Sequence, residues 1–177
     1  MKLVIASDIH GAAEGCQSLM REIDRLHPDK IVLLGDLLYH GPRNDLPADY
    51  DPKHVIALLN EHSSHIVAVR GNCEAEVDQM VLDFPCMAPY NTLFDPSVGA
   101  TLFLTHGHLY GPGLHNSVRN MPRLGPADVL VYGHTHIKVD EIHEGIRCFN
   151  PGSVGIPKDG SRSFAVYEDG VFTHCLL

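Results

Sequence analysis

The stretch VYGHTH, residues 131–136, leads from an apolar segment directly into His134 and His136. Imidazoles at such a place are either ordinary hydrogen-bonding residues at the edge of a core or ligands of a metal ion. A single His-x-His pair does not separate these two roles. Whether His134 and His136 bind a metal ion therefore depends on the polar residues that follow the other apolar segments of the chain.

Four other apolar segments also end in side chains with oxygen or nitrogen donors. KLVIAS leads to Asp8 and His10, KIVLLG to Asp36, HIVAVRG to Asn72, and TLFLT to His106. Taken singly, an aspartate there suits a helix N-cap or a turn, and an asparagine suits a turn. Seven donors at the ends of five segments, however, show the convergence that a metal centre in a crevice requires. Mixed carboxylate, amide and imidazole donors suit Mn²⁺, Zn²⁺, Fe or Ni²⁺ better than Ca²⁺.

The five apolar segments have the composition of strands that are buried on both faces. Helical spacing of apolar residues over 12–26 predicts a helix after the first strand, and Asp51-Pro52 predicts the start of a second. Strand and helix alternation favours a mainly parallel sheet. Ligands bind outside the carboxyl ends of such strands, where the seven donors are expected to gather.

The last third of the chain has a different pattern. Residues 137–150 read as two strands joined at Glu144-Gly145, and residues 163–177 as a hairpin that turns at Asp169-Gly170. These antiparallel strands either extend the first sheet or form a second one. The polar loop 40–52, with three prolines, is expected at the rim of the site.

Length and composition limit the number of domains, the partners and the cellular compartment that can be expected. A length of 177 residues suits one domain over 1–177, and a net charge of −9 argues against duplex nucleic acid as a partner. Five cysteines without a C-x-x-C pair indicate free thiols in a reducing compartment. The chain shows no signal peptide and no apolar run long enough for a membrane span, so a cytoplasmic protein without a membrane partner is predicted.

The order of these motifs resembles the calcineurin-like metallophosphoesterase superfamily, and within it the YfcE-like bacterial phosphodiesterases. The resemblance spans residues 3 to about 158 and rests on SDIHG, LYHGPRN, AVRGNCEAEVDQM, LTHGHLYGP, VYGHTH and FNPGSVGIPK. It implies the α/β fold of that superfamily, a four-layer α/β/β/α sandwich of two mixed sheets flanked by helices. It also implies a dinuclear metal centre and hydrolysis of small phosphodiesters by a metal-bridging hydroxide.

The resemblance also assigns roles to single residues. It places Asp8, His10 and His136 on one metal ion, Asn72, His106 and His134 on the other, and Asp36 between the two. Mn²⁺ is the expected metal. Asp36, Asn72, Cys73 and His108 are the candidate catalytic residues, and Arg43 and His108 are the candidate substrate contacts. Many superfamily members carry histidine where this chain has Cys73, and a thiol is the weaker hydrogen-bond donor.

Two alternatives stay open at this point. One is a non-catalytic scaffold of the same fold, like the retromer subunit of the superfamily, although such scaffolds have an eroded ligand set. The other is a phosphomonoesterase or a protein phosphatase. The segment GDLLYHG lacks the additional Asp-Arg-Gly expected of protein phosphatases, which counts against that form of the alternative. A small phosphodiester is the expected partner, and a homo-oligomer is compatible with the sequence.

Overall fold

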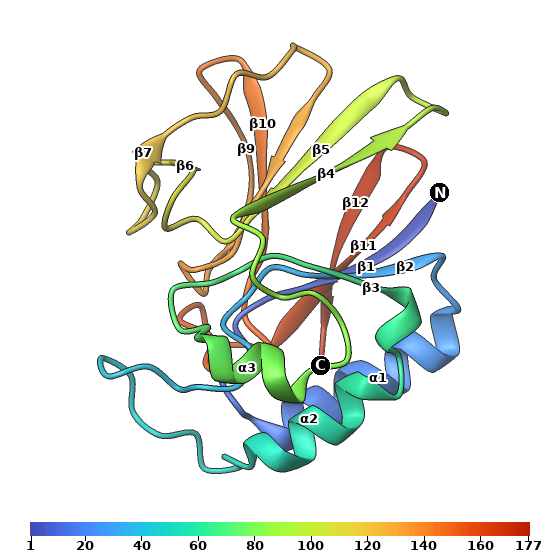
Figure 1. Ribbon diagram of the computed structural model, residues 1–177. Helices are drawn as coiled ribbons and strands as arrows, with labels where there is room; N and C mark the ends of the chain where they lie inside the picture. Colours follow the sequence, from blue (N-terminus) through green and yellow to red (C-terminus); the bar gives the residue numbers. More distant parts are fainter.

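Two five-stranded mixed sheets pack against each other in the computed structural model, which describes residues 1–177 (Figure 1). The first sheet has the strand order β12-β11-β1-β2-β3. Its strands are β1 (Lys2–Ala6), β2 (Lys30–Leu33), β3 (Ile66–Ala68), β11 (Ser163–Glu168) and β12 (Val171–Leu176). β1, β2 and β3 run parallel, and the hairpin of β11 and β12 joins β1 in antiparallel pairing.

The second sheet has the order β4-β5-β8-β10-β9. Its strands are β4 (Tyr90–Asp95), β5 (Ala100–Thr105), β8 (Val129–Val131), β9 (Lys138–His143) and β10 (Ile146–Pro151). Here β5, β8 and β10 are parallel, and antiparallel strands form both edges. The expected parallel arrangement is thus divided between two sheets. The first sheet also contains the antiparallel strands β11 and β12, and the second contains β4 and β9.

Residues of one strand alternate between two hydrophobic cores. In β1, Leu3 and Ile5 point into the core between the sheets, whereas Val4 and Ala6 point toward the helices. All four are fully buried. Because both faces of the strand are covered, the sequence there is continuously apolar instead of alternating with polar residues.

Helices cover the outer face of the first sheet (Figure 1). Those that contribute to its core are α1 (Ala13–Leu26) and α2 (Pro52–Asn60). A 3₁₀ turn, η1 (Ser63–His65), lies between α2 and β3, and the short helix α3 (Glu76–Val81), which buries no residue, follows β3. The first two confirm the predicted helices, and the Asp51 carboxylate caps α2 by accepting the His54 N–H at 3.1 Å. None of the helices combines the length and the apolar composition that a membrane crossing requires.

The outer face of the second sheet is covered by residues 106–128, which contain the short strands β6 (Gly111–Pro112) and β7 (Arg119–Asn120) but no helix. Tyr110, Met121 and Leu124 of this segment pack on the buried core of that face. Four glycines and three prolines disfavour a helix here. The predicted sandwich of two mixed sheets is confirmed, but its fourth layer is this irregular segment and not the layer of helices that the resemblance implied.

Both predicted hairpins are confirmed. The turn between β9 and β10 has φ values of 51° at Glu144 and 83° at Gly145, and that between β11 and β12 has 47° at Asp169 and 88° at Gly170. Two successive residues with positive φ form the type I′ turn that matches the twist of antiparallel strands.

Candidate metal centre

The loops that follow β1, β2, β3, β5 and β8 meet where the carboxyl ends of these strands come together. All seven predicted metal ligands lie there in one connected cluster. Their side chains fall into two groups, and one carboxylate faces both. The members are Asp8, His10, Asp36, Asn72, His106, His134 and His136.

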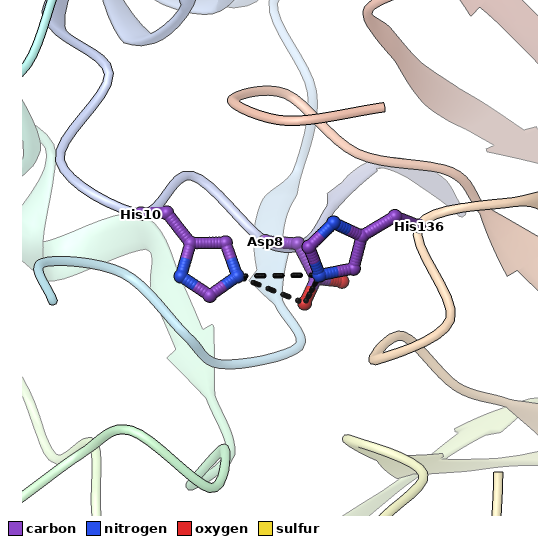
Figure 2. Close-up of side chains that lie close together, drawn as sticks. All are labelled: Asp8, His10 and His136. Atoms are coloured by element: carbon purple, nitrogen blue, oxygen red, sulfur yellow. Dashed lines mark hydrogen bonds and ion pairs between the residues drawn. The ribbon is translucent and has the colours of Figure 1, made fainter. Parts of the chain in front are cut away.

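The first group consists of Asp8, His10 and His136 (Figure 2). The Nε2 atoms of His10 and His136 lie 3.3 Å apart. Asp8 Oδ1 lies 3.2 Å from the Nε2 of His136 and 3.6 Å from that of His10. Figure 2 shows the two rings and the carboxylate directed at one another. All three residues are buried.

The hydrogen bonds of the two rings determine what their Nε2 atoms can do. His10 Nδ1 donates to the Tyr39 carbonyl at 2.7 Å, and His136 Nδ1 donates to the Ile156 carbonyl at 2.6 Å. In the neutral rings each Nε2 therefore carries a lone pair. The buried Asp8 Oδ1 also lacks a hydrogen-bond donor. Three electron-rich atoms directed at one another without a donor fit a bound cation.

The second group consists of Asp36, His106 and His134, with Asn72 beside it. His106 Nδ1 donates to the Leu34 carbonyl at 2.7 Å, which again directs Nε2 inward. This Nε2 lies 3.3 Å from Asp36 Oδ2, 3.1 Å from Asn72 Oδ1 and 3.3 Å from His134 Nδ1. Asp36 Oδ2 is also 3.6 Å from His10 Nε2, so this carboxylate faces both groups.

A left-handed backbone conformation is shared by most of the cluster. Nine residues other than glycine have a positive φ, and five of them are candidate ligands: Asp8, His10, Asp36, His134 and His136. Such a conformation is strained for a residue with a Cβ and is concentrated at functional sites. The fold thus holds these side chains in place at a cost in stability.

Comparison with known proteins identifies the family. The model of the calcineurin-like phosphoesterase superfamily domain matches residues 1–169. The chain belongs to the calcineurin-like phosphoesterase superfamily. Phosphodiesterase YfcE of Escherichia coli is 46% identical over 98% of this chain and 90% of its own length. The solved structure of YfcE, a phosphoesterase, matches with a TM-score of 0.90 over 98% of this chain and 91% of its own. The predicted resemblance is confirmed.

Two more distant proteins are also similar to this chain. The probable metallophosphoesterase YsnB of Bacillus subtilis is 28% identical over 89% of this chain and 78% of its own length. A metallophosphoesterase structure from Sphaerobacter thermophilus has a TM-score of 0.62 at 21% identity, and covers 100% of this chain and 88% of its own. At that identity the similarity shows a common fold and no more.

Charges in the cluster support the binding of a cation. Burial alone would raise the pKa of Asp8, but His136 and His10 outweigh it and hold that pKa well below its ordinary value. Burial likewise opposes a charge on His106, yet Asp36 and Asp8 raise its pKa to about 10. The carboxylates therefore draw positive charge into a buried space, where either a proton or a metal ion satisfies them.

The remaining predicted site residues lie around the cluster. The Cys73 backbone N–H donates to Asp36 Oδ1 at 2.8 Å, and the Cys73 thiol lies near the side chains of His10 and Asp36. The ring centroid of His108 is 5.3 Å from that of His106. Burial and the charge of His106 lower the pKa of His108 to about 4, so this ring is neutral at physiological pH. Arg43 lines the site cavity.

Glu74 is a buried site residue that sequence reasoning missed. Its carboxylate accepts the backbone N–H groups of Asp36 at 2.9 Å, Leu37 at 2.7 Å and Gly71. It thereby joins the loop after β2 to the loop after β3. Burial and the nearby charge of Asp36 raise the pKa of Glu74. The only sequence signal was a carboxylate within two residues of the Gly71-Asn72 pair.

The cluster opens into a cavity of about 180 Å³. Its lining comprises Asp36, Arg43, Asn44, Asn72, Asn116, His134, His136 and Lys158. Arg43 and Asn44 come from the 40–52 loop, which was expected at the rim. Asn116 and Lys158 were missed. Lys158 ends the FNPGSVGIPK motif, whereas nothing in the sequence singled out Asn116.

Proposed function

We propose that this chain is a phosphodiesterase that uses two divalent metal ions to hydrolyse small phosphodiesters. One observation carries the proposal: two groups of buried nitrogen and oxygen donors converge, and Asp36 faces both of them. A structural role for so many inward-directed lone pairs has no physical advantage, because an unpaired buried polar atom destabilises the fold.

The predicted enzyme class, a phosphoric diester hydrolase, is confirmed by the family domain and by 46% identity to a phosphodiesterase over nearly the full chain. The number of ions, their identity and the small size of the substrate are parts of the proposal. The small, polar cavity of about 180 Å³ supports a small substrate, since pockets for drug-sized ligands are roughly 300–1,000 Å³.

Each group of donors would hold one ion. Asp8, His10 and His136 would bind the first, and Asn72, His106 and His134 the second, with Asp36 between them. Nitrogen donors mixed with carboxylate and amide oxygens support Mn²⁺ as the first choice, with Zn²⁺, Fe or Ni²⁺ as alternatives. When bound, the ions would supply a nucleophilic hydroxide at neutral pH and neutralise charge on the phosphoryl group.

The side chains around the ligands would bind and orient the ester. Arg43 is positioned to contact a phosphoryl oxygen, because it lines the cavity beside Asp36 and Asn72. His108, neutral and with a buried Nδ1 that has no partner, is available for a hydrogen bond at the second group. Burial, followed by the charge of Asp36, raises the pKa of the Cys73 thiol. Cys73 therefore stays a neutral thiol and a weak donor beside the reaction centre.

The experiment compares metal content with hydrolysis of two esters. Purified protein that has been supplemented with Mn²⁺ is expected to retain close to two ions per chain and to hydrolyse bis(p-nitrophenyl) phosphate faster than p-nitrophenyl phosphate. A faster monoester reaction would make the chain a phosphomonoesterase. Retained metal without hydrolysis of either ester would favour the scaffold alternative, and protein that holds no metal would overturn the proposal.

The proposal also places the protein in the cytoplasm. All five cysteines are free, and Cys16, Cys86 and Cys148 are buried. Free thiols of this kind are typical of a reducing compartment. A small phosphodiester is the proposed partner, in place of duplex nucleic acid or a membrane, and sedimentation velocity tests for a homo-oligomer.

A further inference from the structure

The site cavity has no hydrophobic lining residue. Of its eight lining residues, Asn44 and Asn116 are asparagines outside the proposed metal ligands, and two, Arg43 and Lys158, are cations. A nucleobase is normally bound by stacking on an aromatic or apolar surface, and the lining offers no Phe, Tyr or Trp. Amides and cations instead suit a substrate whose groups are hydroxyls and anions.

The two cations of the cavity are free of ion-pair partners. Of the 13 Lys and Arg side chains, eight have a hydrogen-bond or ion-pair partner within the chain. Arg43 and Lys158 are two of the remaining five, and both line this one cavity. In a chain of net charge −9, two unpaired cations at the same cavity are available for an external anion.

The backbone around Lys158 fixes its position beside His136. The Lys158 N–H donates to the His136 carbonyl at 3.0 Å, and His136 Nδ1 donates to the Ile156 carbonyl at 2.6 Å. The adjacent carboxylate, Asp159, is paired with Lys138 and not with Lys158: its Oδ2 accepts a hydrogen bond from the Lys138 backbone N–H at 2.8 Å and forms an ion pair with Lys138 Nζ at 2.8 Å. Lys158 is thus left as a free charge on a segment clamped to a metal ligand.

Asn116 is held at the cavity by the loop that follows the THGH motif. The Val118 N–H donates to the Gly107 carbonyl at 3.0 Å, and the Ser117 hydroxyl and N–H both donate to the Leu114 carbonyl. His115, directly before Asn116, has a φ of 55°. The hydrogen bonds hold the backbone around Asn116, an exposed residue that lines the cavity.

We propose that the natural substrate is a small, polar phosphodiester that carries a second anionic group, a phosphate or a carboxylate, on one of its alcohols. Lys158 recognises this second anion, while Arg43 contacts the scissile phosphodiester and Asn116 a hydroxyl group. The inference rests on the proposed phosphodiesterase activity. It makes Lys158 a specificity residue, because a diester with one charge does not require two free cations in addition to the metal centre.

The test uses four phosphodiesters with the same p-nitrophenolate leaving group. Their second alcohol is ethyl, 2-carboxyethyl, 2-phosphoethyl or 2-(trimethylammonio)ethyl, so the added charge runs from neutral through negative to positive. Each kcat/KM is divided by the uncatalysed rate of that ester. We expect the 2-phosphoethyl ester to exceed the ethyl ester by about tenfold, mainly through a lower KM, and the cationic ester to be the poorest. Comparison of the carboxylate with the phosphate identifies the preferred anion.

Two variants test whether Lys158 causes the preference for an anionic ester. Lys158→Met is expected to reduce the anionic preference to within about twofold, and high salt is expected to weaken it in the unchanged enzyme. Lys53→Met, on the exposed surface of α2 and outside the cavity, is the matched control and is expected to keep the preference. Equal rates for the ethyl and 2-phosphoethyl esters, or a preference that survives Lys158→Met, would overturn the inference. Hydrolysis of none of the four esters would instead overturn the phosphodiesterase proposal itself.

Discussion

Asp49 and Arg162 form a bidentate ion pair, with their oxygen and nitrogen atoms 2.9 and 3.1 Å apart. Asp49 Oδ2 also accepts the backbone N–H groups of Glu14 at 3.0 Å and Gly15 at 3.3 Å. Ala12, the N-cap residue of α1, has no side chain to do this. A carboxylate from the 40–52 loop therefore caps α1, and the same contacts fasten the loop that carries Arg43.

Asp49→Asn is expected to lower the free energy of unfolding by about 1 kcal/mol at neutral pH, because it removes a partly exposed ion pair and a charged cap. Burial opposes the charge on Asp49, but Arg162 outweighs it and lowers the pKa of Asp49 below 3.8. A lowered pKa stabilises the fold above pH 3.8, and this stabilisation is lost as pH falls through the folded-state pKa. Urea unfolding from pH 7 down to 3 measures the difference, with Asp45→Asn in the same loop as control.

Asp36→Asn is expected to abolish phosphodiester hydrolysis and to reduce the metal content at both groups. An amide in place of the carboxylate removes a negative charge that faces His10 on one side and His106 on the other. Metal analysis after dialysis and a diesterase assay measure the two effects. Asp83→Asn, at an exposed position, is the control. Wild-type turnover in Asp36→Asn would remove the shared role assigned to this residue.

Glu74→Gln is expected to lower the free energy of unfolding by about 1–3 kcal/mol. Glutamine has one acceptor oxygen in place of two, so at least one of the buried N–H groups of Asp36, Leu37 and Gly71 loses its partner. Chemical unfolding checks this effect. The exposed Glu76→Gln, two residues along, should change stability little. Equal losses in the two variants would show that Glu74 does not join the two loops.

The neutral thiol at position 73 predicts a preference for good leaving groups. In a series of aryl phosphodiesters, the rate is expected to fall steeply as the pKa of the leaving phenol rises. Cys73→His introduces a stronger proton donor and should accelerate the poorest leaving groups most, on the order of tenfold. A flat dependence in the unchanged enzyme would contradict this role. Complete loss of turnover in Cys73→Ala would instead identify the thiol as a reactive group.

The sequence predicted those parts of the fold that depend on local patterns. The apolar segments before Asp8, Asp36, Asn72, His106 and His134 are strands, because burial on both faces imposes continuous apolar composition. The Asp51-Pro52 cap and the Asp169-Gly170 turn are equally local signals. From these strand ends alone it followed that the seven donors would converge.

Features that depend on tertiary pairing were missed. Strand β4 was not predicted, because Tyr90–Asp95 is an edge strand with mixed polar and apolar residues, and three of them are exposed. The division of the strands between two sheets came from the family resemblance instead of the local pattern. Glu74, Asn116 and Lys158 are single polar residues whose roles exist only after separate loops meet. The identity of a lysine does not reveal which cavity it will line.

The left-handed backbone at five candidate ligands has a consequence for attempts to stabilise the molecule. Glycine adopts a positive φ without the penalty of a Cβ, so a glycine at any of these positions would ease folding while it removes a candidate ligand. Conformational stability and metal binding therefore make opposite demands on these five positions, and a search for more stable variants should leave them unchanged.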